Sequence, residues 1–319
     1  MPIPNSVLVT TGKGGVGKTT TAAHLAGLAA QGDWDVLVVD ADGQGNLSRD
    51  LGYEPDGGVA LARALRGDGP LEVTCDPKRA HLHYVSGGRA IDEAVTRAGI
   101  SMSQGSGGAV RAFERALGPI CDRYHLVVID SPPRELLLRR MLLTAARFFV
   151  VPTGIDATGI DGIADLLHTV GEVRVEDNPK LEMLGVIVGP LAKQAHAIRR
   201  EVATEIGELL GDPGIVFDTT IRHAPAIARR CREEGLLTNE YELIAATAKA
   251  TRKSYWKMTK EERRDAKTYS DAAEPLAADW QALVSEIMGR FQECLAADSA
   301  APAGNVPSGV AQPGVDGSL

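Results

Sequence analysis

Five short runs of apolar residues recur along the chain without the polar alternation of a half-exposed strand. They span residues 7–10, 36–40, 126–130, 148–151 and 184–188. Continuous runs of this length are typical of strands buried on both faces of a parallel sheet. Because parallel strands need crossover connections, we predict an α/β fold with a doubly wound, mostly parallel sheet, helices on both faces and right-handed crossovers.

Segments with helical periodicity separate these runs. Residues 18–31 place small and aliphatic side chains on one face, and Gly32 is a plausible C-cap. Further helices are predicted at residues 109–123 and 198–210. Two shorter strand candidates, residues 82–85 and 215–217, complete the alternating pattern.

Composition narrows the class of protein. With 44% hydrophobic and 24% charged residues over 319 positions, the chain is not disordered as a whole. The four cysteines have no short spacing, which excludes a disulfide scaffold and the usual zinc and iron–sulfur patterns. The net charge of −8 means that any binding of nucleic acid must come from a local basic patch.

The C-terminal part differs in composition from the rest. We expect a main α/β domain at residues 1–250, then a basic and amphipathic helical extension at 251–296. The helix predicted at residues 276–295 carries large apolar side chains on one face. Residues 297–319 are rich in Ala, Pro, Gly and Ser, so we expect a disordered tail.

The glycine-rich segment 12–19 fits the pattern G-x-x-x-x-G-K-[ST] between a predicted strand and a predicted helix. Such a loop turns successive backbone N–H groups toward an anion, and the helix N-terminus adds its positive dipole end. Lys18 is placed to reach the β- and γ-phosphates of a nucleotide, and the Thr19 hydroxyl is a hard ligand for Mg²⁺. The residues predicted to bind ATP are Gly12, Lys13, Gly14, Gly15, Val16, Gly17, Lys18, Thr19 and Thr20.

Carboxylates end two of the apolar runs. Asp130 stands where a doubly wound sheet places ligand-binding groups, and we expect it to hold Mg²⁺ together with Thr19. Asp40 and Asp42 end the second run, and one of these carboxylates could orient an attacking water. An exposed cap at a strand end is the alternative for each of them.

Three blocks carry a family resemblance: residues 13–20 (KGGVGKTT), 38–46 (VVDADGQGN) and 128–133 (VIDSPP). In this order and spacing the chain resembles the ParA/MinD family of deviant Walker A P-loop ATPases, over about residues 5–235. The resemblance implies an ATP-dependent homodimer in which Lys13 reaches the partner's phosphates, as an arginine finger does. It also implies that Asp42 positions the hydrolytic water, that Asp130 serves Mg²⁺, and that Asp40 has a supporting role. The expected catalytic residues are Lys13, Lys18 and Asp42.

The sequence departs from the family pattern at four places. Gly43 stands where most relatives have Pro, and Ser131 replaces a frequent Cys. Residues 134–138 (RELLL) replace a small Ser-Leu-Gly-type turn, and residues 221–225 (IRHAP) differ from Ile-Pro-Arg-Asn. These differences put base contacts and dimer geometry in question but leave the phosphate chemistry intact.

Three branches of function stay open. The first is a ParA-like partition ATPase that binds DNA non-specifically and is stimulated by a ParB-like adaptor. The second is a MinD-like ATPase on membranes, which would need a basic amphipathic helix. The helix at 276–295 carries acidic Asp279, Glu286 and Glu293 on its polar face, so we expect it to pack on the sheet and expect no membrane partner. The third is a metabolic P-loop enzyme.

Basic residues support the partition branch. The candidate DNA contacts are Arg199, Arg200, Arg229, Arg230, Lys253 and Lys257. Two copies in a dimer would double the phosphate contacts and make DNA binding ATP-dependent and salt-sensitive. Solvated helix faces with local glutamates are the alternative. We therefore expect a slow, partner-stimulated ATP hydrolase for plasmid or chromosome partition or cargo positioning, cytoplasmic and nucleoid-associated when ATP-bound.

Overall fold

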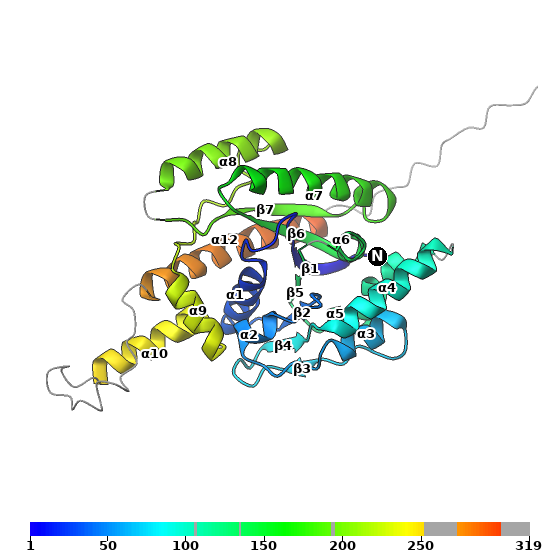
Figure 1. Ribbon diagram of the computed structural model, residues 1–319, viewed down its shortest axis with the longest axis horizontal. Coiled ribbons are helices and arrows are strands. Elements are labelled where there is room, and N and C mark those ends of the chain that lie inside the picture. Colours follow the sequence, from blue (N-terminus) through cyan, green and yellow to red (C-terminus); the bar gives the residue numbers. More distant parts are fainter. Residues whose placement is uncertain (105–106, 134, 193–194, 252–272, 301–319) are drawn as a thin grey trace, which may run out of the picture.

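A computed structural model describes residues 1–104, 107–133, 135–192, 195–251 and 273–300. Within these ranges one sheet has the strand order β3-β4-β2-β5-β1-β6-β7, and every neighbouring pair is parallel except β3 with β4 (Figure 1). The strands are β1 (Ile3–Val9), β2 (Val36–Asp40), β3 (Thr74–Cys75), β4 (Leu82–Val85), β5 (Leu126–Asp130), β6 (Ala146–Thr153) and β7 (Glu182–Val188). The predicted doubly wound, mostly parallel sheet is confirmed.

Helices connect the strands and cover both faces of the sheet (Figure 1). They are α1 (Lys18–Gln31), α2 (Leu47–Leu51), α3 (Val59–Arg66), α4 (Arg89–Ser103), the 3₁₀ helix η1 (Gly107–Arg111), α5 (Ala112–Cys121), α6 (Leu136–Ala145), α7 (Ala157–Glu176), α8 (His196–Leu210), α9 (Pro225–Glu234), α10 (Thr238–Thr251) and α12 (Ala273–Ala300).

Alternation along each strand divides the core into two layers. In β1, Leu8 packs with helices α3 to α8, whereas Val7 and Val9 pack with α1, α2, α9, α10 and α12. All three side chains are fully buried. Burial on both faces is the physical reason for the unbroken apolar runs in the sequence.

Two predicted elements differ from the structure. Residues 215–217 form only an isolated parallel bridge, Val216 with Val186 of β7, because the following Asp218 and Thr219 N–H groups turn to the Glu286 carboxylate. The helix predicted at 109–123 begins instead as the 3₁₀ helix η1 and becomes α-helical at Ala112.

Helix α12 lies in the same layer as α1, and its apolar face, including Leu283, Ile287 and Phe291, is fully buried against the sheet. It extends to Ala300 rather than ending at residue 296, and Asp298 in its last turns accepts hydrogen bonds from the Arg147 guanidinium at 2.8 and 2.9 Å. The basic segment 252–272 and residues 301–319 of the predicted tail lie outside the described residues. No helix among the described ranges is long and apolar enough to cross a membrane.

Candidate functional site

The loop between β1 and α1 has the geometry of a phosphate cradle. Gly17 caps α1 with φ 88°, and Gly15 has φ 78°, both in the left-handed region that favours glycine. A Cβ at Gly12 would lie 2.1 Å from the carbonyl oxygen of Gly162 in α7, so only glycine permits this close approach. The N-terminus of α1 therefore opens directly into the loop, as anion binding requires.

Lys18 lies inside this loop and is buried. Burial lowers the pKa of its ammonium group, while the nearby carboxylates of Asp130 and Asp42 oppose that shift and the charge of Arg139 adds to it. Its Nζ lies 3.4 Å from the carbonyl oxygen of Lys13. The site therefore holds a partly dehydrated cation, which a phosphate group would stabilise.

Two carboxylates meet at the carboxyl ends of neighbouring strands. Asp40 of β2 and Asp130 of β5 are register partners in the sheet, and both side chains are fully buried. Burial raises the pKa of Asp40 to about 7 and raises that of Asp130 well above its usual range. Asp40 accepts hydrogen bonds from the N–H groups of Asp42 (2.9 Å) and Leu47 (3.1 Å), which fits its expected supporting role.

Asp130 differs from Asp40 because no backbone N–H donates to its carboxylate oxygens among the described residues, and the Thr19 hydroxyl is the side-chain donor that opposes the rise in its pKa. A buried carboxylate with so few donors is costly, so its environment is suited to a ligand. Together with the Thr19 hydroxyl at the start of α1, this carboxylate gives a set of hard oxygen donors that fits Mg²⁺. The predicted pairing of Thr19 and Asp130 at one metal site stays a prediction.

The loop after β2 is held close to α4. Asp42 accepts a hydrogen bond from the N–H of Gln44 at 2.9 Å and is mostly buried. A Cβ at Gly43 would lie 2.2 Å from Oδ1 of Asp92 on α4. The Asp92 carboxylate therefore lies against the backbone of the loop at position 43, where the family pattern favours proline.

Lys13 forms an ion pair within its own chain, with Nζ 2.8 Å from Oδ2 of Asp156. Asp156 is the N-cap of α7, where its side chain also accepts a hydrogen bond from the N–H of Gly159 at 3.0 Å. Asp156 is not among the site residues predicted from the sequence. An aspartate between the end of an apolar run and a helical segment is a typical N-cap signal and could have found it.

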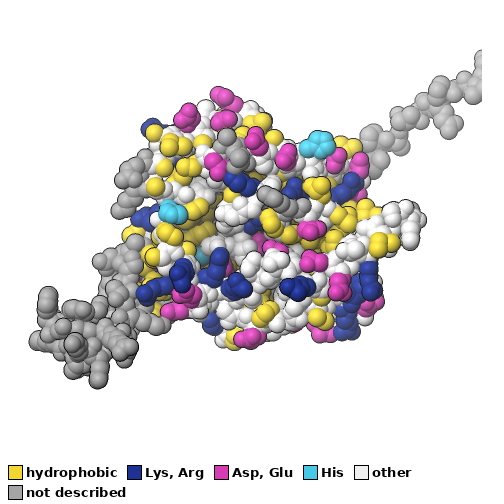
Figure 2. Space-filling model, in the orientation of Figure 1, with side chains coloured by type: hydrophobic (Ala, Val, Ile, Leu, Met, Phe, Trp, Pro, Cys, Tyr) yellow, Lys and Arg dark blue, Asp and Glu magenta, His cyan; other side chains and the backbone are white. Residues whose placement is uncertain are grey.

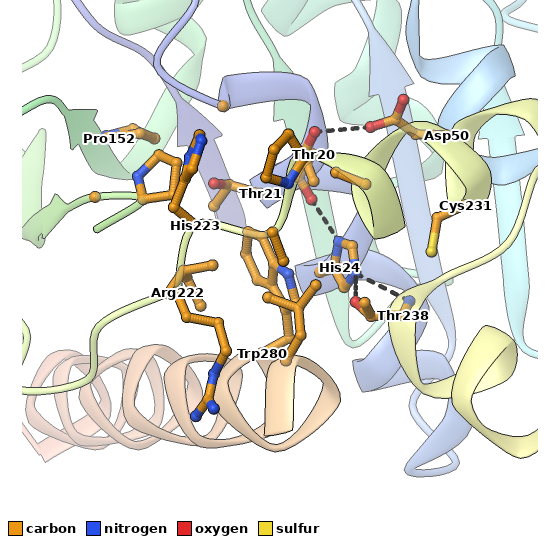
Figure 3. A pocket seen from close by; sticks show the side chains of 18 of the residues that line it. Thr20, Thr21, His24, Asp50, Pro152, Arg222, His223, Cys231, Thr238 and Trp280 are labelled. Carbon is orange, nitrogen blue, oxygen red and sulfur yellow. Dashed lines mark hydrogen bonds between the residues drawn. The ribbon is translucent and has the colours of Figure 1, made fainter. Parts of the chain in front are cut away.

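An apolar cavity of about 270 Å³ adjoins the phosphate loop (Figure 3). Gly17 and Thr21 at the start of α1 and Trp280 of α12 form part of its walls. Pro190, in the loop after β7, and His223, in the loop before α9, also line it. Its apolar walls and its position next to the phosphate cradle suit a flat heterocyclic base. Thr20 also lines the cavity, but its hydroxyl donates to Asp50 of α2 at 2.9 Å, away from the loop.

His24 also lines this cavity, and its ring stacks on Trp280 with ring centroids 4.1 Å apart (Figure 3). Its ring nitrogens form hydrogen bonds with the carbonyl oxygen of Thr20 and the N–H of Thr238. Burial lowers the pKa of His24 to about 4, below the ordinary value of 6.5. The unfolded chain therefore takes up the proton first as pH falls, and the stability that neutral His24 contributes is lost between pH 6.5 and 4.

The predicted quantity is the free energy of unfolding of the wild type minus that of His24→Gln. We expect this difference to be about 2 kcal/mol smaller at pH 5 than at pH 8. Urea unfolding of both proteins at the two pH values measures this difference, and carboxyl groups that titrate in both cancel. His168→Gln, at an exposed position, is the matched control. An equal difference at both pH values would contradict the prediction.

Four of the predicted DNA-contacting residues lie on two described helices, α8 and α9. On α8, Arg200 is exposed, but Arg199 donates to the carbonyl oxygens of Phe217 (2.6 Å) and Asp218 (2.7 Å). On α9, Arg229 pairs with Glu233, and Figure 2 shows Lys and Arg side chains over this helix interspersed with acidic ones. Arg230 follows Arg229 and is half-buried. Lys253 and Lys257 lie outside the described residues.

Comparison with known proteins identifies the family. A family profile described as an AAA domain matches residues 5–183. The chromosome-partitioning ATPase Soj of Thermus thermophilus is 38% identical over 55% of this chain and 65% of its own length. The chromosome partitioning protein ParA of Caulobacter vibrioides is 33% identical over 66% of this chain and 77% of its own length.

Solved structures share the fold. The ATP complex of a Cyanothece McdA variant has a TM-score of 0.68 and 19% identity, covering 91% of this chain and 98% of that one. Cobyrinic acid a,c-diamide synthase from Mycobacterium smegmatis, with ADP and magnesium, has a TM-score of 0.61 and 24% identity, covering 81% and 96%. Identities this low show the fold alone. The AAA-domain match and the similarity to ParA, joined to the geometry of the phosphate loop, confirm the resemblance: the chain belongs to the family of ParA- and Soj-type P-loop ATPases.

Proposed function

We propose that this protein is a partition ATPase that hydrolyses ATP with Mg²⁺, dimerises on ATP and binds DNA non-specifically. The observation that carries the proposal is the buried ammonium group of Lys18 in the loop together with the buried carboxylate of Asp130, which interacts with it. Two family relatives are named for chromosome partitioning, one neighbour in fold was crystallised with ADP and magnesium, and another with ATP.

In the proposed mechanism, N–H groups of residues 12–17 and the Lys18 ammonium hold the phosphates. Thr19 and Asp130 would hold Mg²⁺, which when bound would neutralise phosphate charge. Lys13 leaves Asp156 and reaches the terminal phosphate of the partner's ATP, so that dimerisation depends on that phosphate. Both residues of this ion pair are partly exposed, and such pairs are weak, so exchanging one anion for another costs little.

Asp42 is proposed to orient the attacking water, as the resemblance implies. Replacing Asp42 with alanine should therefore slow turnover by a factor of 10² to 10⁴, the usual effect of a positioned acid or base, and leave ATP binding largely intact. Size-exclusion chromatography with ATP should then show a long-lived dimer. Undiminished phosphate release would assign the water to another residue.

Asp92→Asn is the matched control for Asp42→Ala. It alters a neighbouring carboxylate that contacts the Gly43 position from α4 without being assigned to the chemistry. We expect Asp92→Asn to retain most of the turnover. Equal losses in both variants would mean that the loop conformation, and not the Asp42 carboxylate, limits hydrolysis.

The proposed nucleic-acid contacts are Arg200 and Arg230 together with the basic segment 252–272, and a ParB-like adaptor is the proposed stimulating partner. A membrane role has less support, because the apolar face of α12 is buried against the sheet. Its acidic residues serve the same docking: Asp279 pairs with Arg222 at 2.6 Å, and Glu286 accepts from Asp218 and Thr219.

One titration tests the proposal: binding to non-specific duplex DNA and to anionic liposomes, each with ATP and with ADP, over a series of salt concentrations. ATP-dependent DNA binding that weakens steeply with salt supports partition and a nucleoid-associated, cytoplasmic location. Retention on liposomes would favour the membrane branch. Binding to neither would favour a metabolic enzyme.

A further inference from the structure

Arg139 of α6 is a buried cation that has no carboxylate partner among the residues that the structure describes. Its side chain is 5% exposed, its Nε is buried with no hydrogen bond, and it forms no ion pair with a described residue. One guanidinium nitrogen donates to the carbonyl oxygen of Pro133 at 3.2 Å. The next residue, Arg140, by contrast pairs with both Glu176 and Asp177.

The position of Arg139 connects it to the phosphate loop. Its charge contributes to lowering the pKa of Lys18, so the two cations interact electrostatically. Pro133 belongs to the segment that follows Asp130, and its Cβ lies 3.5 Å from where a Cβ of Gly14 would stand. Arg139 thus holds, through Pro133, a segment that lies beside the phosphate loop at Gly14.

A buried guanidinium is costly unless an anion offsets its charge. The carboxylate of Asp165 on α7 opposes the fall in the pKa of Arg139 but forms no ion pair with it. Lys18 repels Arg139, so each phosphate charge that enters the loop stabilises both cations. A triphosphate brings more negative charge to this region than a diphosphate does.

We propose that Arg139 is a positioning residue that senses the terminal phosphate of the bound nucleotide and thereby makes the site prefer ATP over ADP. When that phosphate is present, the guanidinium is stabilised and keeps Pro133, and with it the segment after Asp130, against Gly14. This inference rests on the proposed function, because it takes the ligand to be ATP or ADP.

The test is the ratio of the two affinities. Calorimetric titration of the full chain with Mg²⁺ and either ADP or a non-hydrolysable ATP analogue gives the dissociation constant of each. Arg139→Met removes the positive charge of the guanidinium. The preference for the triphosphate should therefore fall by about tenfold. Arg139→Gln, which keeps a donor for the Pro133 carbonyl but not the charge, should show a similar loss, and Arg139→Lys should restore most of the preference.

Arg140→Met is the matched control, since it removes the same charge one position along α6, where carboxylates already neutralise it. Its preference should equal that of the wild type. An unchanged ratio in Arg139→Met or Arg139→Gln, even with a lower melting temperature, would overturn the inference and leave a structural role. If Arg139→Met does not fold, Arg139→Gln alone decides. Failure of the wild type to bind either nucleotide would instead overturn the proposed function, and this inference with it.

Discussion

Replacing Lys18 with alanine abolishes nucleotide binding under ordinary assay conditions, with ATP and ADP affinity falling by a factor on the order of 100 to 1,000. The reason lies in the burial of this ammonium group next to Asp130. A charge held in a poorly solvated loop interacts with phosphate far more strongly than an exposed lysine would. Equilibrium titration with a fluorescent ATP analogue measures the loss.

Lys180→Ala is the control for Lys18→Ala, because Lys180 is exposed and lies between α7 and β7, outside the phosphate loop. It should bind nucleotide like the wild type. Circular dichroism of the Lys18→Ala protein must show that its helices are intact. Normal ATP affinity in a folded Lys18→Ala variant would contradict the assignment of the loop as the phosphate site.

Replacing Lys13 with alanine separates binding from dimerisation. We expect nucleotide affinity of the monomer to change by less than about threefold, since the Lys13 side chain lies at the partly exposed edge of the loop in an ion pair with Asp156. The ATP-dependent dimer should be lost, and turnover should fall by about 10³ or more, the effect of removing a cation that stabilises phosphoryl transfer in trans. Sedimentation velocity with ATP measures the dimer.

Asp156→Asn is the informative control for Lys13→Ala. It removes the carboxylate that holds Lys13 in its own chain and keeps an N-cap that can accept from Gly159. We expect this variant to dimerise on ATP at least as tightly as the wild type. A normal ATP dimer formed by Lys13→Ala would refute the role of Lys13 in trans.

The fold was largely predictable because its strongest signals are local. Residues 18–31 and 36–40 carry helix and strand patterns that the structure reproduces at the same boundaries. The prediction failed where a tertiary contact opposes the local pattern. Residues 215–217 have the pattern of a strand but form one isolated bridge, because the N–H groups of the next two residues donate to the Glu286 carboxylate of α12.

The site was predictable only in part. The phosphate loop and its carboxylates stand in short motifs, so Lys18 and Asp130 could be found by spacing. Arg199 reads as an exposed basic residue, yet its guanidinium donates to backbone carbonyls of residues 217 and 218. Hydrogen bonds of this kind depend on residues that are distant in sequence, so no local sequence pattern predicts them.

The sequence by itself determined the parallel sheet, the phosphate loop and the family, because burial on two faces and anion binding by glycine-rich backbone each demand a fixed order of residue types. Only the tertiary structure decided that Lys13 pairs with Asp156, that the Asp92 carboxylate faces position 43, and that Arg139 is buried without a carboxylate partner among the residues that the structure describes. These are contacts between residues 49 to 143 positions apart or charges whose burial depends on packing, and no local pattern encodes either.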